Sequence, residues 1–162
     1  MTIASGKCHL DLRREAPEAY RALAALTRAG ALDHRLLELV KVRASQLNGC
    51  AHCAERHLEV ARRAGEAEAR LDALPRWRES AAFTGRERSA LALTDALTLV
   101  ARAPLPEEAL AEAARHFDRH ELADLVVAIT AINAWNRVTL AGRLPLPGLG
   151  ESSTQAPGRA AA

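Results

Sequence analysis

The chain has too few strand-forming residues to build its core from a β-sheet. Seven Val, three Ile and eight Thr are spread over 162 residues, and five residues are aromatic. Ala and Leu, by contrast, number 36 and 24. Strands are enriched in β-branched and aromatic residues, whereas Ala and Leu are strong helix formers. The composition therefore predicts an all-α fold, and the length predicts one domain.

Charge and hydropathy argue against several kinds of partner. The 22 basic and 20 acidic side chains are interspersed, and no basic stripe predicts nucleic-acid binding. The longest uncharged apolar run, residues 125–136, is 12 residues long, whereas a membrane-spanning helix needs roughly 20. Since the first residues also lack a signal-type apolar segment, we expect a cytoplasmic protein that binds neither nucleic acid nor membranes.

Helical periodicity and cap residues divide residues 16–143 into six to seven helices. Asp33 and Thr84 suit N-caps, and Glu87 completes a capping box with Thr84. Gly49 suits a left-handed helix end. The expected helices are 17–28, 34–47, 50–64, 66–74 with a short segment around Trp77, 86–101, 107–117 and 121–141.

The two ends of the chain and two of its helices carry further expectations. Residues 1–15 are expected to form an extended or frayed arm, and residues 144–162, rich in Pro and Gly, a disordered tail. Helices 34–47 and 122–140 are apolar around most of their circumference. Such helices are central in a bundle or lie in a subunit interface. Because one small chain has little room for two of them, we expect an obligate homo-oligomer.

A C-x-x-C pair begins the helix after the first of these apolar helices. Cys50 and Cys53 lie in its first turn, where free amide groups and the helix dipole favour the thiolate. Their spacing allows a disulfide. In a reducing compartment such a pair is redox-active or metal-binding rather than a structural crosslink. Cys8 has no partner at a diagnostic spacing.

Two further residues extend this pair into a proton relay. His57 follows Cys53 by one helical turn and can accept its proton. Glu38 lies about 15 Å before the end of its helix and His57 about 12 Å into the next, so an antiparallel hairpin brings them to nearly the same height. The apolar neighbours of Glu38 predict a raised pKa, as in a general base. A relay through Glu38, His57, Cys53 and Cys50 is therefore available.

Structural alternatives stay open for these residues. The cysteines and histidines could bind zinc, although structural zinc sites draw on two separated ligand pairs and the sequence has one. Glu38 could be a core carboxylate paired with Arg43 or Arg56. His52 points away from His57 by helix geometry and could line the opening of the site.

A second polar segment, residues 133–137, contains Trp135 between Asn133 and Asn136. It could form a binding element. A buried Trp with two amides that satisfy backbone groups at a helix or subunit contact is the favoured interpretation.

The pattern Glu38, eleven residues, Cys50-Ala-His52-Cys53, three residues, His57 resembles the signature of the alkylhydroperoxidase D (AhpD-like) branch of the carboxymuconolactone decarboxylase superfamily. A looser resemblance to its stand-alone, single-repeat members extends from about residue 10 to residue 145. The resemblance implies an all-helical fold, assembled as trimers or hexamers.

The resemblance also implies a thiol-dependent peroxidase without cofactor or metal. Cys53 would become a sulfenic acid, and Cys50 would donate a proton and then resolve it as a disulfide. Glu38, His52 and His57 would belong to the proton relay, and an external dithiol, of thioredoxin or lipoyl type, would be the reductant. Decarboxylases of this superfamily are expected to lack the cysteine pair. The alternatives are a redox-sensing or disulfide-shuttling protein and a decarboxylase-like enzyme.

Overall fold

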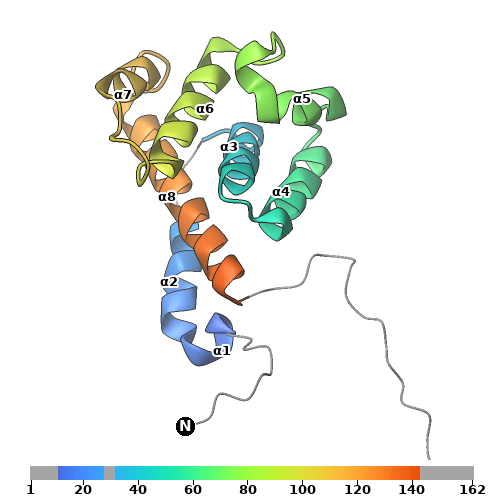
Figure 1. Cartoon of the computed structure of the whole chain (residues 1–162), viewed down its shortest axis with the longest axis vertical. Helices are drawn as coiled ribbons and strands as arrows, with labels where there is room; N and C mark the ends of the chain where they lie inside the picture. The colour runs from blue at the N-terminus through green and yellow to red at the C-terminus, as the bar shows by residue number, and fades with distance from the viewer. Residues whose placement is uncertain (1–10, 28–31, 143–162) are drawn as a thin grey trace, which may run out of the picture.

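The computed structural model describes residues 11–27 and 32–142, and within them the chain consists of helices and connecting turns (Figure 1). These residues form eight α-helices and one 3-10 helix and contain no strand, which confirms the all-α prediction. The helices are α1 (Leu12–Glu15), α2 (Pro17–Thr27), α3 (His34–Leu47), α4 (Ala51–Arg63), α5 (Glu68–Ala73), η1 (Leu74–Glu79), α6 (Gly85–Thr98), α7 (Glu107–Ala113) and α8 (Arg119–Gly142). The expected tail 144–162 and the first ten residues, with Cys8, lie outside the described part.

The described helices outnumber the expected six to seven because two short segments are helical. In place of the extended or frayed end of the predicted arm, Leu12–Glu15 forms α1, since the Asp11 side chain caps it by accepting from the amides of Arg13 and Arg14. The short segment around Trp77 is the 3-10 helix η1, which has a kink at Arg76. Local capping thus orders a stretch in which no apolar periodicity was visible.

The predicted punctuation of the longer helices is confirmed. Asp33 accepts from the Leu36 amide at 3.0 Å, and Thr84 and Glu87 form the capping box of α6. Gly49 has a φ of 66°, a left-handed conformation that ends α3. Because α4 begins at Ala51, Cys50 is its N-cap residue and Cys53 lies in its first turn.

Helix α3 lies at the centre of the bundle, as its apolar circumference predicted. It packs against α4, α6 and α8 (Figure 1). One apolar cluster joins it to α6, α7 and α8, and a second joins it to α4, α5 and η1. Glu38 projects from this central helix and is 2% exposed, so any chemistry at its carboxylate takes place inside the protein.

The other apolar helix, α8, is 24 residues long and joins the bundle to α2. It packs against α2, α3, α4 and α6, and α2 lies along its C-terminal half (Figure 1). None of residues 17–27 is buried.

By length and composition α8 is the one helix of the described residues that could cross a membrane. Its packing against four helices accounts for the same composition, because a central bundle helix has apolar residues on most sides.

A buried carboxylate ties α6 to α3 and η1. Asp95 of α6 accepts from Nε and Nη2 of Arg43 at 2.6 and 3.2 Å and from Nε1 of Trp77 at 3.3 Å. Arg78 donates to the same carboxylate. Asp95 is 6% exposed. This cluster fixes the side of α3 that faces α6 and η1.

Candidate functional site

The turn between α3 and α4 sets the position of the cysteine pair. After the left-handed Gly49, the amide of Cys50 donates back to the carbonyl of Ser45 at 3.0 Å. A residue with a Cβ is strained at this φ, which is why Gly occupies the position. The chain therefore reverses within the three residues 48–50, and α4 runs back along α3 (Figure 1).

A network of side-chain amides holds this turn against α8. Nδ2 of Asn48 donates to Oδ1 of both Asn133 and Asn136 at 2.9 Å, and Nδ2 of Asn136 donates to Oγ of Ser45 at 3.0 Å. The two asparagines of α8 thus lie at a helix contact, as predicted, but across it they bond side chains and not the backbone groups that were expected. Trp135 differs from the expectation, because it is half-buried and donates through Nε1 to Oγ1 of Thr27 at 2.7 Å.

Cys50 and Cys53 are joined as a disulfide at the start of α4. Their Cα atoms are 5.3 Å apart. The exposed fractions are 1% for Cys50 and 5% for Cys53, and Cys53 is the one that lines a cavity. A molecule in that cavity therefore contacts Cys53 and not Cys50.

Glu38 and His57 meet, as the helix-length argument predicted. Nδ1 of His57 lies 2.7 Å from Oε2 of Glu38. Since a carboxylate only accepts, the histidine donates from Nδ1, which leaves Nε2 as the proton acceptor when the ring is neutral. Nζ of Lys41 donates to the other carboxylate oxygen at 2.7 Å, and Nε2 of His34 lies 3.8 Å from it.

The raised pKa expected for Glu38 is wrong. Burial alone raises the pKa of this carboxyl, but the hydrogen bonds and charges of His57 and Lys41 outweigh it and lower the pKa below the ordinary 4.5. Glu38 is therefore a carboxylate that orients His57 rather than a base. Its contribution to stability is present above the ordinary pKa and is lost as the pH falls through the lowered folded-state pKa.

Lys41 is the site residue that the sequence analysis missed. The signal was available, because the chain has only two lysines and Lys41 follows Glu38 by three residues, on the same helical face. The arginines considered as partners lie elsewhere: Arg43 bonds Asp95, and Arg56 is exposed and lines the cavity. A compact ammonium on a flexible stem reaches a buried carboxylate where a planar guanidinium needs more room.

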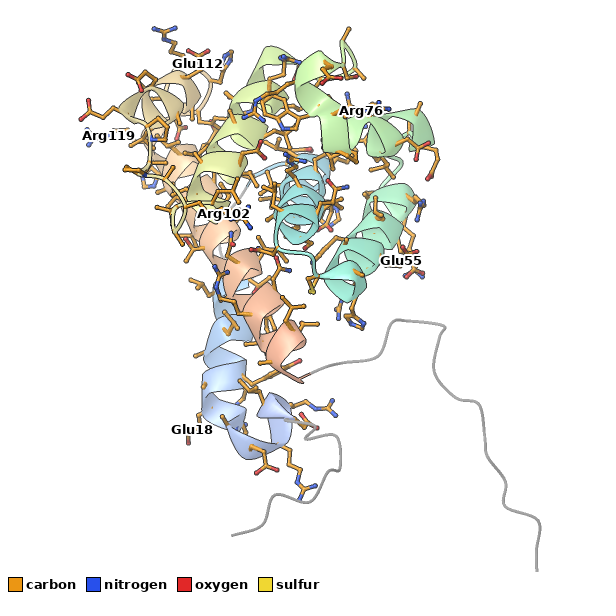
Figure 2. The ribbon with its side chains drawn as sticks, in the orientation of Figure 1. Glu18, Glu55, Arg76, Arg102, Glu112 and Arg119 are labelled. Carbon is orange, nitrogen blue, oxygen red and sulfur yellow. A yellow bond between two sulfur atoms is a disulfide. The ribbon has the colours of Figure 1, made fainter. Side chains whose placement is uncertain are left out.

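The cavity beside Cys53 has a volume of about 700 Å³ and lies between α4, α8 and the α1–α2 segment. His52, Cys53, Arg56 and His57 of α4 form one side, so His52 lines the same cavity as His57. Figure 2 shows Glu55, by contrast, on the outer face of α4. Among the described residues, no three His, Cys, Asp or Glu side chains gather in a way that would hold a metal ion.

The site combines a C-x-x-C disulfide at a helix junction with a buried glutamate that is bonded to a half-buried histidine, within a small all-helical protein. The sequence model of the carboxymuconolactone decarboxylase family matches residues 14–96. This chain belongs to that family, as an AhpD-like member.

Two relatives and one solved structure support this membership. The chain is 36% identical to the uncharacterized protein YdfG of Bacillus subtilis over 115 residues, which are 71% of this chain and 78% of YdfG. It is 32% identical to the uncharacterized protein YnjA of Escherichia coli over 120 residues, 73% of this chain and 64% of YnjA. A protein of unknown function from Agrobacterium tumefaciens, described as a candidate AhpD antioxidant defence protein, has a TM-score of 0.82 and 36% identity, over 87% of this chain and 99% of that one.

More distant structures share the fold. The debrominase Bmp8 has a TM-score of 0.73 at 21% identity, over 82% of this chain and 73% of that one. An uncharacterized peroxidase-related protein from a Silicibacter species has a TM-score of 0.70 at 20% identity, over 82% and 70% of the two chains. One fold is therefore shared by a debrominase and by a protein described as peroxidase-related, so the residues of the site, and not the fold, must decide the activity.

Proposed function

We propose that this protein is a thiol-dependent peroxidase that reduces hydroperoxides through Cys50 and Cys53. The observation that carries the proposal is the position of Cys53. It lines a cavity beside His57, whose Nδ1 is held by the buried carboxylate of Glu38, and it can bond Cys50. A thiol, a base and a group that orients the base are the parts that activate a cysteine nucleophile. The antioxidant description of the Agrobacterium protein agrees with this chemistry.

The proposed cycle starts from the dithiol. His57 takes the proton of Cys53 at Nε2, and the thiolate attacks one oxygen of the hydroperoxide. The O–O bond breaks, and the leaving oxygen takes a proton and departs as alcohol or water. Cys53 is then a sulfenic acid, which Cys50 attacks with loss of water to form the disulfide. An external dithiol, of thioredoxin or lipoyl type, returns two electrons and two protons.

Mass spectrometry of the cysteines after stoichiometric hydroperoxide tests the proposed roles. In the Cys50→Ser variant, we expect a sulfenic acid trapped on Cys53, because no resolving thiol remains. In the Cys53→Ser variant, we expect no oxidation of Cys50 on the same timescale and loss of steady-state turnover with a dithiol reductant. The wild type should give the disulfide and consume one peroxide per pair.

Two results would contradict the assignment. Peroxide turnover that persists undiminished in Cys53→Ser removes that cysteine from the chemistry. A wild-type rate with hydroperoxide no faster than that of the free dithiol reductant favours the alternative, a redox-sensing or disulfide-shuttling protein.

We also propose that the protein is a homo-oligomer in which α2 and α8 form the subunit interface. Leu26 of α2 is 39% exposed and Leu140 of α8 is 48% exposed. Helix α2 also has no buried residue, so both helices present apolar side chains that a second subunit could cover. Sedimentation velocity should give three or six times the 17.4 kDa of one chain. Leu140→Glu should shift the distribution to smaller species, whereas the control Val100→Glu, on the turn after α6, should not. A wild-type protein that sediments as one chain at micromolar concentration would disprove this.

A further inference from the structure

The size of the cavity beside Cys53 points to a ligand much larger than hydrogen peroxide. Its volume of about 700 Å³ falls within the roughly 300–1,000 Å³ that encloses a drug-sized organic ligand. Hydrogen peroxide is close in size to water, which occupies about 30 Å³ in the liquid. A site for hydrogen peroxide alone would leave most of this volume without contacts. The cavity therefore has room for an organic body attached to the reacting group.

The wall opposite α4 is apolar and held in place. Tyr20 and Trp135 pack edge to face with ring centroids 5.0 Å apart. Nε1 of Trp135 is already bonded to Thr27, whose hydroxyl in turn donates to the carbonyl of Leu23 at 2.9 Å. The indole thus has its polar atom satisfied and offers a ligand its carbon surface. Aliphatic residues complete this wall: Leu12, Ala24, Ile132 and Val138.

Two arginines give the lining of the same cavity a positive charge. Arg56 of α4, one turn after Cys53, and Arg13 of α1 both line it. Within residues 11–27 and 32–142, neither guanidinium is paired with a carboxylate. Asp11 is the single acid among the described lining residues, and its carboxylate accepts from the α1 amides. Each guanidinium group therefore has donors available to an anionic group in the cavity.

We propose that the cavity binds an organic hydroperoxide with an apolar body and a carboxylate, the carboxylate held by Arg56, with Arg13 adding to the positive charge of the lining. The apolar body lies against Tyr20 and Trp135, and the hydroperoxide group reaches Cys53. A guanidinium recognises a carboxylate through two parallel hydrogen bonds, which gives orientation as well as attraction. This inference rests on the proposed peroxidase function, and the product it implies is the corresponding hydroxy acid.

Matched substrates and matched variants test the charge preference. We would measure kcat/KM with a dithiol reductant for a medium-chain fatty-acid hydroperoxide and for its methyl ester. The acid should be favoured by about tenfold in the wild type, and the ratio should fall close to one in Arg56→Gln and in the double variant with Arg13→Gln. The control Arg63→Gln removes a charge from the exposed face of the same helix and should keep the wild-type ratio. An acid-to-ester ratio near one in the wild type would overturn the proposal.

A binding measurement separates this proposal from the peroxidase function. Trp135 lines the cavity and Trp77, the other tryptophan, is buried in the core, so ligand-dependent fluorescence that disappears in Trp135→Phe reports the cavity. Decanoate should bind the disulfide form about tenfold more tightly than methyl decanoate, and Arg56→Gln should abolish the difference. If this preference is found while no hydroperoxide is turned over, the peroxidase function fails and the anion site stands. Equal binding of decanoate and its ester would overturn the site.

Discussion

Replacement of Glu38 by glutamine is expected to slow the oxidation of Cys53 by hydroperoxide by about 100-fold or more. A neutral amide cannot balance the positive charge of Lys41. Its NH2 group must also face a hydrogen-bond donor, either the Lys41 ammonium or Nδ1 of His57, and two donors cannot bond each other. The imidazole then loses the contact that fixes its tautomer, and general base catalysis is commonly worth 10²- to 10⁴-fold. Stopped-flow measurement of thiol loss in the reduced protein gives this rate directly.

The control for this variant is Glu55→Gln, which removes a carboxylate from the exposed face of α4 (Figure 2) and should react at the wild-type rate. Lys41→Met should act through Glu38. Without the ammonium the pKa of Glu38 rises, so the acid limb of the rate profile should move to higher pH while the rate on the plateau falls less than in Glu38→Gln. A Glu38→Gln rate within about threefold of wild type, in a protein with an unchanged circular dichroism spectrum, would show that Glu38 has only a structural role.

Removal of the Asp95 side chain should lower the free energy of unfolding more than removal of any other single carboxylate in the described core. Asp95→Ala leaves the guanidinium of Arg43, which is 12% exposed, without its partner and frees Nε1 of the buried Trp77. Breaking one side of a buried ion pair typically destabilises a protein by about 3–5 kcal/mol. Urea denaturation followed by far-UV circular dichroism, at one fixed protein concentration, measures the change in the free energy of unfolding.

The matched control is Glu112→Ala, which removes an exposed carboxylate bonded to Arg115 at 2.9 Å. Exposed pairs of this kind contribute about 0–1 kcal/mol, so this variant should unfold close to the wild type. A loss below about 1 kcal/mol for Asp95→Ala would mean that Arg43 and Arg78 find solvent or other partners, and that α3 does not depend on this cluster.

Much of the fold follows from local rules that the sequence displays directly. Asp33, Thr84 with Glu87, and Gly49 act within one helical turn, so their roles could be predicted from spacing alone. The meeting of Glu38 and His57 follows from the same geometry, because helix rise and one tight turn determine it. Helix α1 was missed because its cap, Asp11, stands in a stretch without apolar periodicity.

The parts that could not be predicted depend on contacts between distant segments. The Asp95 cluster joins residues 52 positions apart in the chain, and no spacing rule connects them. The cavity is assembled from α1, α2, α4 and α8, so its size has no counterpart in a local pattern. The protonation state of Glu38 was misjudged for a different reason. Its apolar sequence neighbours suggested desolvation, whereas hydrogen bonds and charge interactions with His57 across the hairpin and with Lys41 one turn later lower its pKa.

The amide network around Asn48 limits how far the backbone can move when the cysteines are oxidised. The turn before Cys50 is bonded to α8 through side chains that do not change with redox state. Residues three apart at the start of a helix already have Cα atoms about 5 Å apart, within the range that a disulfide requires. The pair can therefore close and reopen with its backbone in one place. A redox sensor needs a segment that moves when the disulfide forms or breaks. The fixed backbone around Cys50 and Cys53 therefore suits repeated catalytic turnover better than signalling.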